Sequence, residues 1–364
     1  MKIQNLRIKN FKSIYDIRLS DIPAFAVFAG ANGSGKSNFF QAVEFYKDIV
    51  TTGARHALSR HGGYEDIRPH QLPRDQAGTF LFEISVKLKE QIYRHKLELQ
   101  QMDTRPALRE KFLVNEKDIA SRENDIFING KKIDIRYSQD KSVLDMVTDT
   151  AAPFTEWLGY VQCYLIDPAR AREPDDFFSQ EFPDRHVANL TSVLDNFRKD
   201  KEKQCVILDE ISAIVPGIEE ISVVRENLSN RMTLTFTEMG IQQPFPSRLI
   251  SDGTIYALSV LAILFSTRGG MAMIEEPERG LNPMAIQEMV RIFREKSDDF
   301  QIFINTHSET FVRLAQPGDL FMVDKPEGRT LIRNVWHHYP NYNYSQMDLN
   351  RMWLSNMFGG GLPW

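Results

Sequence analysis

The sequence predicts an α/β protein with a mostly parallel sheet, helices on both of its faces, and a lobe of antiparallel strands. The apolar run 24–29 ends at a glycine loop and is followed by residues with helical spacing, which gives the order strand, loop, helix. After residue 251 the chain again alternates between helical and apolar strand-like segments, a rhythm typical of a parallel sheet covered by helices. Between these parts, residues 79–136 carry closely spaced strand and turn signals.

The expected elements follow from the N-terminus. Apolar residues alternate with polar ones over 3–11, with one irregularity, which predicts a strand. The continuous apolar run 24–29 indicates a strand buried on both faces. Asn129-Gly130 favours a type I′ turn between two short strands. Further strands are expected at 79–88, 92–99, 126–128, 133–135, 221–224, 232–236, 271–274 and 301–305, and helices from residue 37, at 187–198, 204–214 and 254–266, from residue 283, and at 345–357.

Composition narrows the class of protein. The 364 residues are 42% hydrophobic and 26% charged, which is typical of a globular protein that buries a core. The formal net charge of −5 argues against a constitutive, non-specific nucleic-acid coat, but it leaves a local basic groove open. Cys163 and Cys205 are isolated, so no disulfide scaffold or zinc site is expected, and a reducing cytoplasm fits. The absence of a long apolar run argues against a membrane span.

The segment Gly30–Ser37 matches the pattern G-x-x-x-x-G-K-[ST] at every fixed position. The glycines let backbone N–H groups surround phosphate oxygens, Lys36 reaches the β- and γ-phosphates, and the Ser37 hydroxyl ligates Mg²⁺. The helix that follows turns its positive end toward the same phosphates. The motif therefore predicts a nucleotide site. The residues expected to bind the nucleotide here are Asn32, Gly33, Ser34, Gly35, Lys36, Ser37 and Asn38.

A second motif, at 271–277, has four apolar residues followed by two adjacent acids. Such a strand delivers its carboxylates to the C-terminal edge of a parallel sheet, where α/β sites lie. In a phosphate-loop enzyme the first acid, Glu275, holds the hydrated Mg²⁺, and the second, Glu276, polarises the attacking water. The first acid is more often Asp, so direct and water-mediated contacts with Mg²⁺ both stay open. Alone this motif is common at solvated strand ends, but after a phosphate loop it is better explained as catalytic.

A third motif, at 302–308, is an apolar strand that ends in polar residues and includes His307. At that edge a histidine can hydrogen-bond the γ-phosphate or orient the water. A histidine at a strand end is often structural, but its place one strand after the acids favours a catalytic role. The expected catalytic residues are therefore Lys36, Glu276 and His307.

The fourth motif, Ser251–Thr254, precedes a long apolar helix. Ser251 or Asp252 would cap that helix in any protein. Together with Gly253, Thr254 and the free N–H groups of the first turn, they also offer a second phosphate-binding surface. One helix N-terminus already serves the phosphates within the chain. A second such surface makes sense if it contacts a nucleotide held by another subunit.

These four motifs, in this order, resemble the ATP-binding-cassette (ABC) heads of the SMC and RecF class, in which ATP is sandwiched between two heads and Ser251–Thr254 takes the place of the signature sequence. The segments 61–68 and 275–283 resemble a narrower branch, the stand-alone bacterial AAA-type ATPases related to the ATPase domain of OLD-family nucleases. Several members of that branch resemble components of anti-phage defence systems. The resemblance implies ATP and Mg²⁺ as cofactors and a P-loop NTPase fold of ABC type.

We expect a single head over 1–344, with a nucleotide-binding core at about 1–50 and 245–335, a β-rich and helical lobe at about 75–244, and a C-terminal helix and tail at 345–364. The residues after His307 are too few for the Toprim nuclease domain of OLD nucleases, and no heptads predict the coiled coil of SMC proteins. The resemblance thus implies a bare ATPase head that forms a homodimer or higher oligomer around ATP. Its output would pass to a separate effector, a nuclease or toxin, in bacterial antiviral defence.

Three questions stay open. The glutamine that contacts the metal in cassette ATPases has no clear match, and Gln71 is a candidate. A RecF-like repair ATPase would instead bind DNA directly in a basic groove, and a scaffold that binds ATP structurally would use its apolar tail. The basic residues for such a groove are Lys131, Lys132, Arg136 and Lys141, or Arg198, Lys199, Lys201 and Lys203, and the apolar tail residues are Met352, Trp353, Met357 and Trp364.

Overall fold

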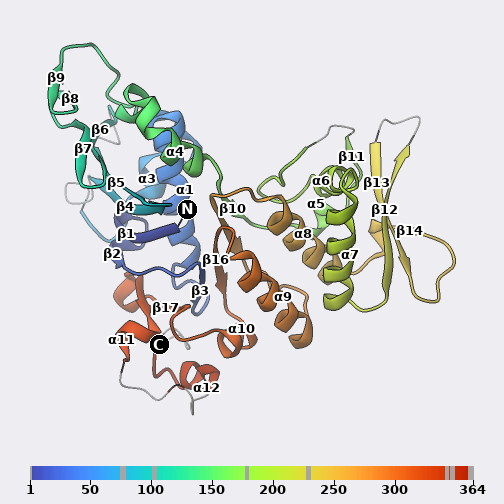
Figure 1. Ribbon diagram of the computed structural model, residues 1–364. Coiled ribbons are helices and arrows are strands. Elements are labelled where there is room, and N and C mark those ends of the chain that lie inside the picture. Colours follow the sequence, from blue (N-terminus) through green and yellow to red (C-terminus); the bar gives the residue numbers. More distant parts are fainter. Residues whose placement is uncertain are drawn as a thin grey trace.

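The computed structural model describes residues 2–73, 79–100, 105–176, 180–226, 231–340, 344 and 349–359, and these residues form three sheets (Figure 1). A six-stranded, mostly parallel sheet lies at the centre. An eight-stranded antiparallel sheet lies to one side of it, and a helical lobe with a four-stranded sheet lies to the other (Figure 1). The predicted fold class, a mostly parallel sheet with an antiparallel lobe, is confirmed.

The central sheet determines where the motifs meet. Its strands run parallel except for the last pair, which is antiparallel. The sequence analysis did not anticipate the first strand or the last two, because each is short and lies outside the motifs. In spatial order the strands are β10 (Val161–Tyr164), β15 (Met271–Glu275), β16 (Gln301–Thr306), β3 (Phe25–Ala29), β17 (Leu320–Asp324) and β18 (Leu331–Asn334).

Both faces of the central sheet are buried, because side chains alternate along its strands. In β3, Val27 belongs to one hydrophobic core and Phe28 to the other. The first core also holds the helices after residue 251, and the second holds the helix after the glycine loop and the antiparallel sheet. All of β3 is buried, so the prediction for this strand is confirmed. The helices are α1 (Lys36–Thr52), α8 (Asp252–Ser266), α9 (Pro283–Lys296) and α10 (Glu309–Leu314).

The antiparallel sheet begins with the N-terminal strands of the chain. The strand at Lys2–Phe11 pairs with residues more than seventy positions later in the chain. A bulge between Ile3 and Asn5 in this strand accounts for the predicted irregularity. Short helices flank this sheet and α1. In spatial order the strands are β2 (Ile14–Leu19), β1 (Lys2–Phe11), β4 (Phe80–Leu88), β5 (Gln91–Gln100), β6 (Ala107–Val114), β7 (Lys117–Arg122), β8 (Ile126–Ile128) and β9 (Lys131–Ile133), and the helices are α2 (Ala54–Arg60), α3 (Tyr64–Ile67) and α4 (Thr148–Gly159), with a 3-10 turn at Val143–Met146.

The hairpin of β8 and β9 follows its turn residues. Asn129 and Gly130 have φ values of 49° and 75°, both in the left-handed region that a type I′ turn requires. The predicted turn is confirmed. The second strand is Lys131–Ile133 rather than 133–135, because a two-residue turn pairs Lys131 with Ile128 at once.

The helical lobe packs on α8 and ends in a small sheet. Its longest strands, at 218–226 and 231–238, pair antiparallel, as the sequence predicts. The polar turn that the sequence predicts near 227–230 lies outside the described residues. The elements of this lobe are α5 (Pro168–Ala171), β11 (Asp175–Asp176), α6 (Leu190–Phe197), α7 (Lys201–Ile214), β12 (Ile218–Glu226), β13 (Arg231–Glu238), β14 (Phe245–Pro246) and a 3-10 turn at Ser247–Leu249.

Two predicted helix starts are wrong. α6 begins at Leu190 rather than 187, because Val187 has a φ of 57° and a β-branched residue in that region cannot continue a helix. α7 begins at Lys201 rather than 204, because the Asp200 carboxylate accepts a hydrogen bond from the Lys203 N–H and caps the helix there.

The C-terminal part returns to the central sheet. After β18 come α11 (Val335–His338) and α12 (Leu349–Leu354), which lies within the predicted helix 345–357. Residues 345–348 and 360–364, including Trp364, lie outside the described part. Met352 and Trp353 are buried, so this helix packs on its own head. Among the described residues no helix is long and apolar enough to cross a membrane.

The division of the chain differs from the expected one in two places. β1 and β2, expected in the nucleotide-binding core, belong to the antiparallel sheet, and β10, expected in the lobe, forms the edge of the central sheet. Sheet membership depends on pairing between strands that lie far apart in the sequence.

Candidate functional site

The C-terminal edge of the central sheet brings three of the motifs together. β3 ends immediately before the glycine loop, and β16 and β15 lie beside it in that order. In parallel register, Thr306 pairs with Ala29 and Asn305 pairs with Glu275. Neighbouring parallel strands end at the same edge of a sheet. The phosphate loop, the two acids and His307 therefore share one edge.

The phosphate loop is held in place by the turn before β18. Gly35 has a φ of 103°, and a Cβ at this position would lie 2.0 Å from Thr330 Oγ1, so only glycine fits. The buried Thr330 hydroxyl donates to Ser34 O at 3.0 Å and lies 2.6 Å from Ser13 Oγ. Asn38 Nδ2 donates to the same Ser13 oxygen at 2.7 Å. Sequence reasoning missed Ser13 and Thr330, because no local pattern links residues so far apart.

The side chain of Lys36 is folded over its own loop. Its Nζ donates to Gly30 O at 2.7 Å and to Ala31 O at 2.9 Å. Burial lowers the pKa of Lys36, and the carboxylates that follow β15 oppose this shift. Asn32 and Gly33 are exposed at the tip of the loop. Because phosphate oxygens are stronger acceptors than the two carbonyls, a triphosphate can draw the ammonium away from them.

Ser37 and Glu275 are in direct contact. Ser37 Oγ donates to Glu275 Oε2 at 2.6 Å, and Asn305 Nδ2 donates to the same oxygen at 3.1 Å. Two adjacent oxygen ligands at a phosphate loop fit Mg²⁺, which takes its other ligands from water and phosphate rather than from a protein cage. The described residues contain no group of three His, Cys, Asp or Glu side chains that could hold a metal.

Glu276 has an unusual backbone conformation. Its φ of 48° is rare for a residue with a side chain, and its N–H donates to Asn305 O at 3.0 Å and to Asn305 Oδ1 at 3.2 Å. Such strain costs about 1–3 kcal/mol and is concentrated at active sites. The side chain is 42% exposed, and its Oε1 lies 3.6 Å from His307 Nδ1. This acid is thus accessible and faces the histidine.

Sequence reasoning assigned no role to Glu278, which is buried beneath these two side chains. Its Oε1 lies 3.9 Å from His307 Nδ1, and burial raises its pKa. The sequence shows a third acid after β15, but an acid near a strand end is usually solvated. In the folded chain this one is buried and bonds to Thr306 and to the His307 N–H.

The segment Ser251–Thr254 caps α8. Ser251 Oγ accepts a hydrogen bond from the Thr254 N–H at 3.1 Å. Ser251 and Asp252 are exposed, whereas the next twelve residues are all buried. The exposed end of this helix is therefore its N-terminus, which attracts anions.

Two contacts tie this helix end to the edge of the central sheet. Arg172 forms an ion pair with Asp252 and reaches it from the segment after β10. Gly253 lies against the loop after β15, where a Cβ would come within 2.2 Å of Gly280 O. The charge of the exposed aspartate is thus partly neutralised, and the helix end packs directly on the loop of the acids.

Gln71 lies at the turn before β18. Its Oε1 accepts a hydrogen bond from the Tyr15 hydroxyl at 3.2 Å, and its amide packs against Gly328. The strand beside β15 is β10, and its glutamine, Gln162, lies within the strand, 3.4 Å from Lys47 Nζ. Neither glutamine follows a strand at the C-terminal edge next to Glu275.

Some residues of each basic group are engaged within the chain. Lys132 pairs with Asp125, and the Lys141 ammonium donates to Thr52 O. Arg198 donates to Val223 O, and Lys203 lies over the ring of Phe197. Figure 1 places β9 and α7 at opposite ends of the molecule, so the two groups do not form one groove within a chain.

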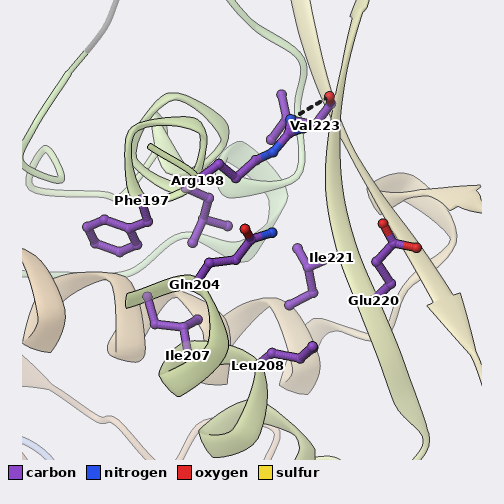
Figure 2. Close-up of a pocket in the computed structure, with 9 residues that line it drawn as sticks. Phe197, Arg198, Gln204, Ile207, Leu208, Glu220, Ile221 and Val223 are labelled. Carbon is purple, nitrogen blue, oxygen red and sulfur yellow. Dashed lines mark hydrogen bonds between the residues drawn. The ribbon is translucent and has the colours of Figure 1, made fainter. Parts of the chain in front are cut away.

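An apolar cavity between α6, α7 and β12 lies away from the motifs (Figure 2). It measures about 50 Å³, which is far below the volume that holds a nucleotide. Its only charged lining residues are Arg198 and Glu220 at the rim. The other lining residues are Leu194, Phe197, Gln204, Ile207, Leu208, Ile221 and Val223.

Comparison with known proteins identifies a family and similar proteins for this chain. Residues 25–313 match the family described as "AAA domain, putative AbiEii toxin, Type IV TA system". An "ATP/GTP phosphatase" of Helicobacter pylori is 19% identical over 333 residues, which cover 86% of this chain and 87% of that protein. The family match over residues 25–313 contains the phosphate loop, the signature-like segment, both acids and His307.

The fold is that of SMC heads. The SMC head bound to the C-terminal winged-helix domain of ScpA is 14% identical and has a TM-score of 0.56, over 92% of this chain and 97% of that chain. An SMC head of Pyrococcus furiosus with an extended coiled coil, bound to the C-terminal domain of ScpA, is 14% identical and has a TM-score of 0.53, over 91% and 95%. The SMC head domain of Thermotoga maritima is 17% identical and has a TM-score of 0.50, over 92% and 99%.

Proposed function

The chain belongs to the AAA-domain family described as putative AbiEii toxin of type IV toxin–antitoxin systems, and on this premise we propose that it is a two-state ATPase switch. It is an ATP hydrolase with an SMC-like head fold. In the proposed cycle two copies close around ATP, hydrolysis opens them, and the two states control a separate effector protein.

The open half of the site carries this proposal. In the phosphate loop Lys36 lies over the loop carbonyls and Ser37 bonds to Glu275, whereas the N-terminal end of α8, which attracts anions, is exposed. A second copy would bring Ser251–Thr254 over the γ-phosphate held by Lys36. Enclosure of that phosphate by both copies would strengthen every charged interaction, because water is excluded.

The roles at the edge follow from charge and position. Lys36 would neutralise the β- and γ-phosphates, and Ser37 and Glu275 would hold the Mg²⁺, which supplies further positive charge. Glu276 is exposed and would orient the attacking water and accept its proton. His307, held beside it, would bind the γ-phosphate.

Exposed apolar side chains beside the α8 end support the interface between copies. Leu249, two residues before Ser251, is 67% exposed, and Met284, at the start of α9, is 77% exposed. The contact between Gly253 and Gly280 keeps the two segments close together. Both apolar side chains are therefore accessible to a partner surface at this end of α8.

The effector part of the proposal rests on the family resemblance. We propose a nuclease or toxin as the effector, within a bacterial antiviral system in the cytoplasm.

Replacing Glu276 with Gln tests the switch. Loss of the base should lower turnover roughly 10²- to 10⁴-fold and trap the closed, ATP-bound dimer. Phosphate release measures turnover, and light scattering after size exclusion, with and without ATP, measures mass. Glu295→Gln, at an exposed position on α9, is the matched control. An E276Q protein that stays monomeric with ATP would overturn the sandwich.

Affinity capture on the trapped E276Q protein then tests the effector proposal. A nuclease or toxin that is retained with ATP and released without it is the expected result. Salt-sensitive binding of plain duplex DNA by the ATP-bound state, with no protein retained, would instead favour the RecF-like alternative.

A further inference from the structure

Glu278 is a buried acid that the roles above do not use. It lies in the loop after β15 and is 8% exposed. Its Oε1 accepts hydrogen bonds from Thr306 Oγ1 at 2.5 Å and from the His307 N–H at 3.3 Å. Its Oε2 is also buried and has no hydrogen-bond partner in the described structure. Glu278 therefore joins the loop of the acids to the loop of the histidine.

This link is one half of a reciprocal pair. Asn305, in β16, holds the backbone N–H of Glu276 through both its carbonyl and its side-chain oxygens. Glu278, after β15, holds the backbone N–H of His307. Each strand thus fixes the catalytic residue of the other strand, and neither residue can shift without breaking a bond to its neighbour.

The link also sets which way His307 faces. His307 Nδ1 lies 3.6 Å from Glu276 Oε1 and 3.9 Å from Glu278 Oε1. Nδ1 is therefore the ring nitrogen that faces the two carboxylates. In the proposed site the other ring nitrogen, Nε2, would contact the bound phosphate.

A purely structural anchor would not need a carboxylate. Glutamine would offer the same acceptor to Thr306 and His307 without the cost of a buried acid. Burial raises the pKa of Glu278, which measures the unfavourable environment of its charge. An acid at such a place, beside a catalytic edge, is typical of a functional role.

We propose that Glu278 is a positioning residue of the hydrolytic site, which ties the loop after β16 to the acids and holds the His307 ring against Glu276. The proposal rests on the proposed function, because it assigns Glu278 the task of orienting a catalytic histidine. It adds a residue that acts through His307 and does not touch the nucleotide.

A double-mutant cycle of Glu278→Ala and His307→Ala tests this. Displacement of a catalytic group can cost on the order of 10²-fold in rate, so E278A should lower kcat roughly 10- to 100-fold. The KM for ATP should change by less than about threefold, since ground-state binding is untouched. The double variant should be no slower than H307A alone, because both changes remove one contribution. Phosphate release under saturating ATP gives kcat.

Glu278→Gln separates charge from anchoring. It keeps the acceptor for Thr306 and His307 but loses the charge near Nδ1, so its kcat should fall between those of the wild type and E278A. Thermal unfolding checks the fold of each variant. If E278A does not fold, E278Q and Thr306→Val, each combined with H307A, complete the same cycle.

Several outcomes would overturn the positioning role. The first is that the effects of E278A and H307A on kcat multiply in the double variant. The second is that E278A raises the KM for ATP and leaves kcat unchanged. The third is that E278A or H307A alone keeps wild-type turnover. Failure of the switch proposal looks different, because E276Q would then hydrolyse ATP normally or stay monomeric whatever Glu278 does.

Discussion

The two surfaces of this chain that we propose to bind phosphate differ in how many internal contacts hold them. Three contacts hold the loop at Gly30–Ser37. Thr330 packs on Gly35, Lys36 bonds to the loop carbonyls, and Ser37 bonds to Glu275. The end of α8 has its cap and a salt bridge to Arg172, but its polar residues are exposed.

This difference shows how a chain can hold a nucleotide without completing its site. Because other groups of the loop are already fixed, binding of a nucleotide would need little reordering beyond the release of Lys36 from Gly30 O and Ala31 O. An exposed helix end beside apolar Leu249 and Met284 gains most when another surface covers it. The braced surface suits binding, and the open surface suits a step that depends on a second copy.

Lys36→Ala breaks the braced surface and should have the largest effect. Without the ammonium, turnover should fall about 10²- to 10³-fold, because one charged donor to the transferred phosphate is lost. Phosphate release and calorimetric titration with ATP measure this. Lys117→Ala, at an exposed position in β7, should leave both unchanged. Wild-type turnover of K36A would refute the assignment of the loop.

Gly253→Ala breaks the open surface. A methyl group 2.2 Å from Gly280 O must displace the end of α8, so turnover should fall roughly 10- to 100-fold. ATP affinity of the single chain should stay within about threefold, since the phosphate loop is intact. Gly159→Ala, where a Cβ meets no atom within 4 Å, is the matched control.

Mixing K36A and G253A chains sharpens the comparison further. In a mixed dimer one site joins an intact phosphate loop to an intact α8 end, so activity should return on mixing although each variant alone is impaired. Assays over a range of mixing ratios measure this. If mixing gives only the average of the two separate activities, the two surfaces do not meet across copies.

Leu249→Asp and Met284→Asp should act on association alone. Burial of either acid at the interface should raise the dissociation constant of the ATP-bound dimer about tenfold, or about 1.4 kcal/mol. Sedimentation of the variants in the E276Q background measures this. Ile135→Asp, which is 52% exposed after β9, should not change it. Unaltered association of both variants would remove these side chains from the interface.

Thr330→Val should act on the stability of the fold rather than on turnover or association. Loss of its hydroxyl leaves Ser34 O and Ser13 Oγ with one partner fewer, so the free energy of unfolding should fall by about 1–3 kcal/mol. Urea denaturation measures this. Thr51→Val, on the exposed side of α1, should change it by less than about 0.5 kcal/mol. A neutral T330V would show that the brace contributes little.

Much of the fold could be predicted, because its signals are local. The strand of 24–29, the turn at Asn129-Gly130 and the α/β rhythm after residue 251 depend on side-chain alternation and backbone preference. The predicted helix starts were wrong where the backbone conformation or the cap of a neighbouring residue determined the start instead. The left-handed Val187 delays α6, and the cap at Asp200 advances α7.

The candidate site divides in the same way. The residues of each motif are contiguous, so the sequence alone specifies the loop of Gly30–Ser37, the acids after β15 and the cap of α8. The partners that these residues contact lie far away in the sequence. Thr330 is nearly three hundred positions from the loop it braces, and Glu278 bonds to Thr306 at the end of β16, 28 positions later in the chain.

The sequence by itself therefore determined the chemistry that this chain carries, since a motif needs only nearby residues with suitable backbone freedom. The tertiary structure alone decided how that chemistry is held. It placed β10 beside β15, moved β1 and β2 to the antiparallel sheet, buried Glu278 and left Ser251 exposed. The pairing of distant strands and the burial of a side chain are properties of the whole packed chain. Both depend on which elements pack against the same surface.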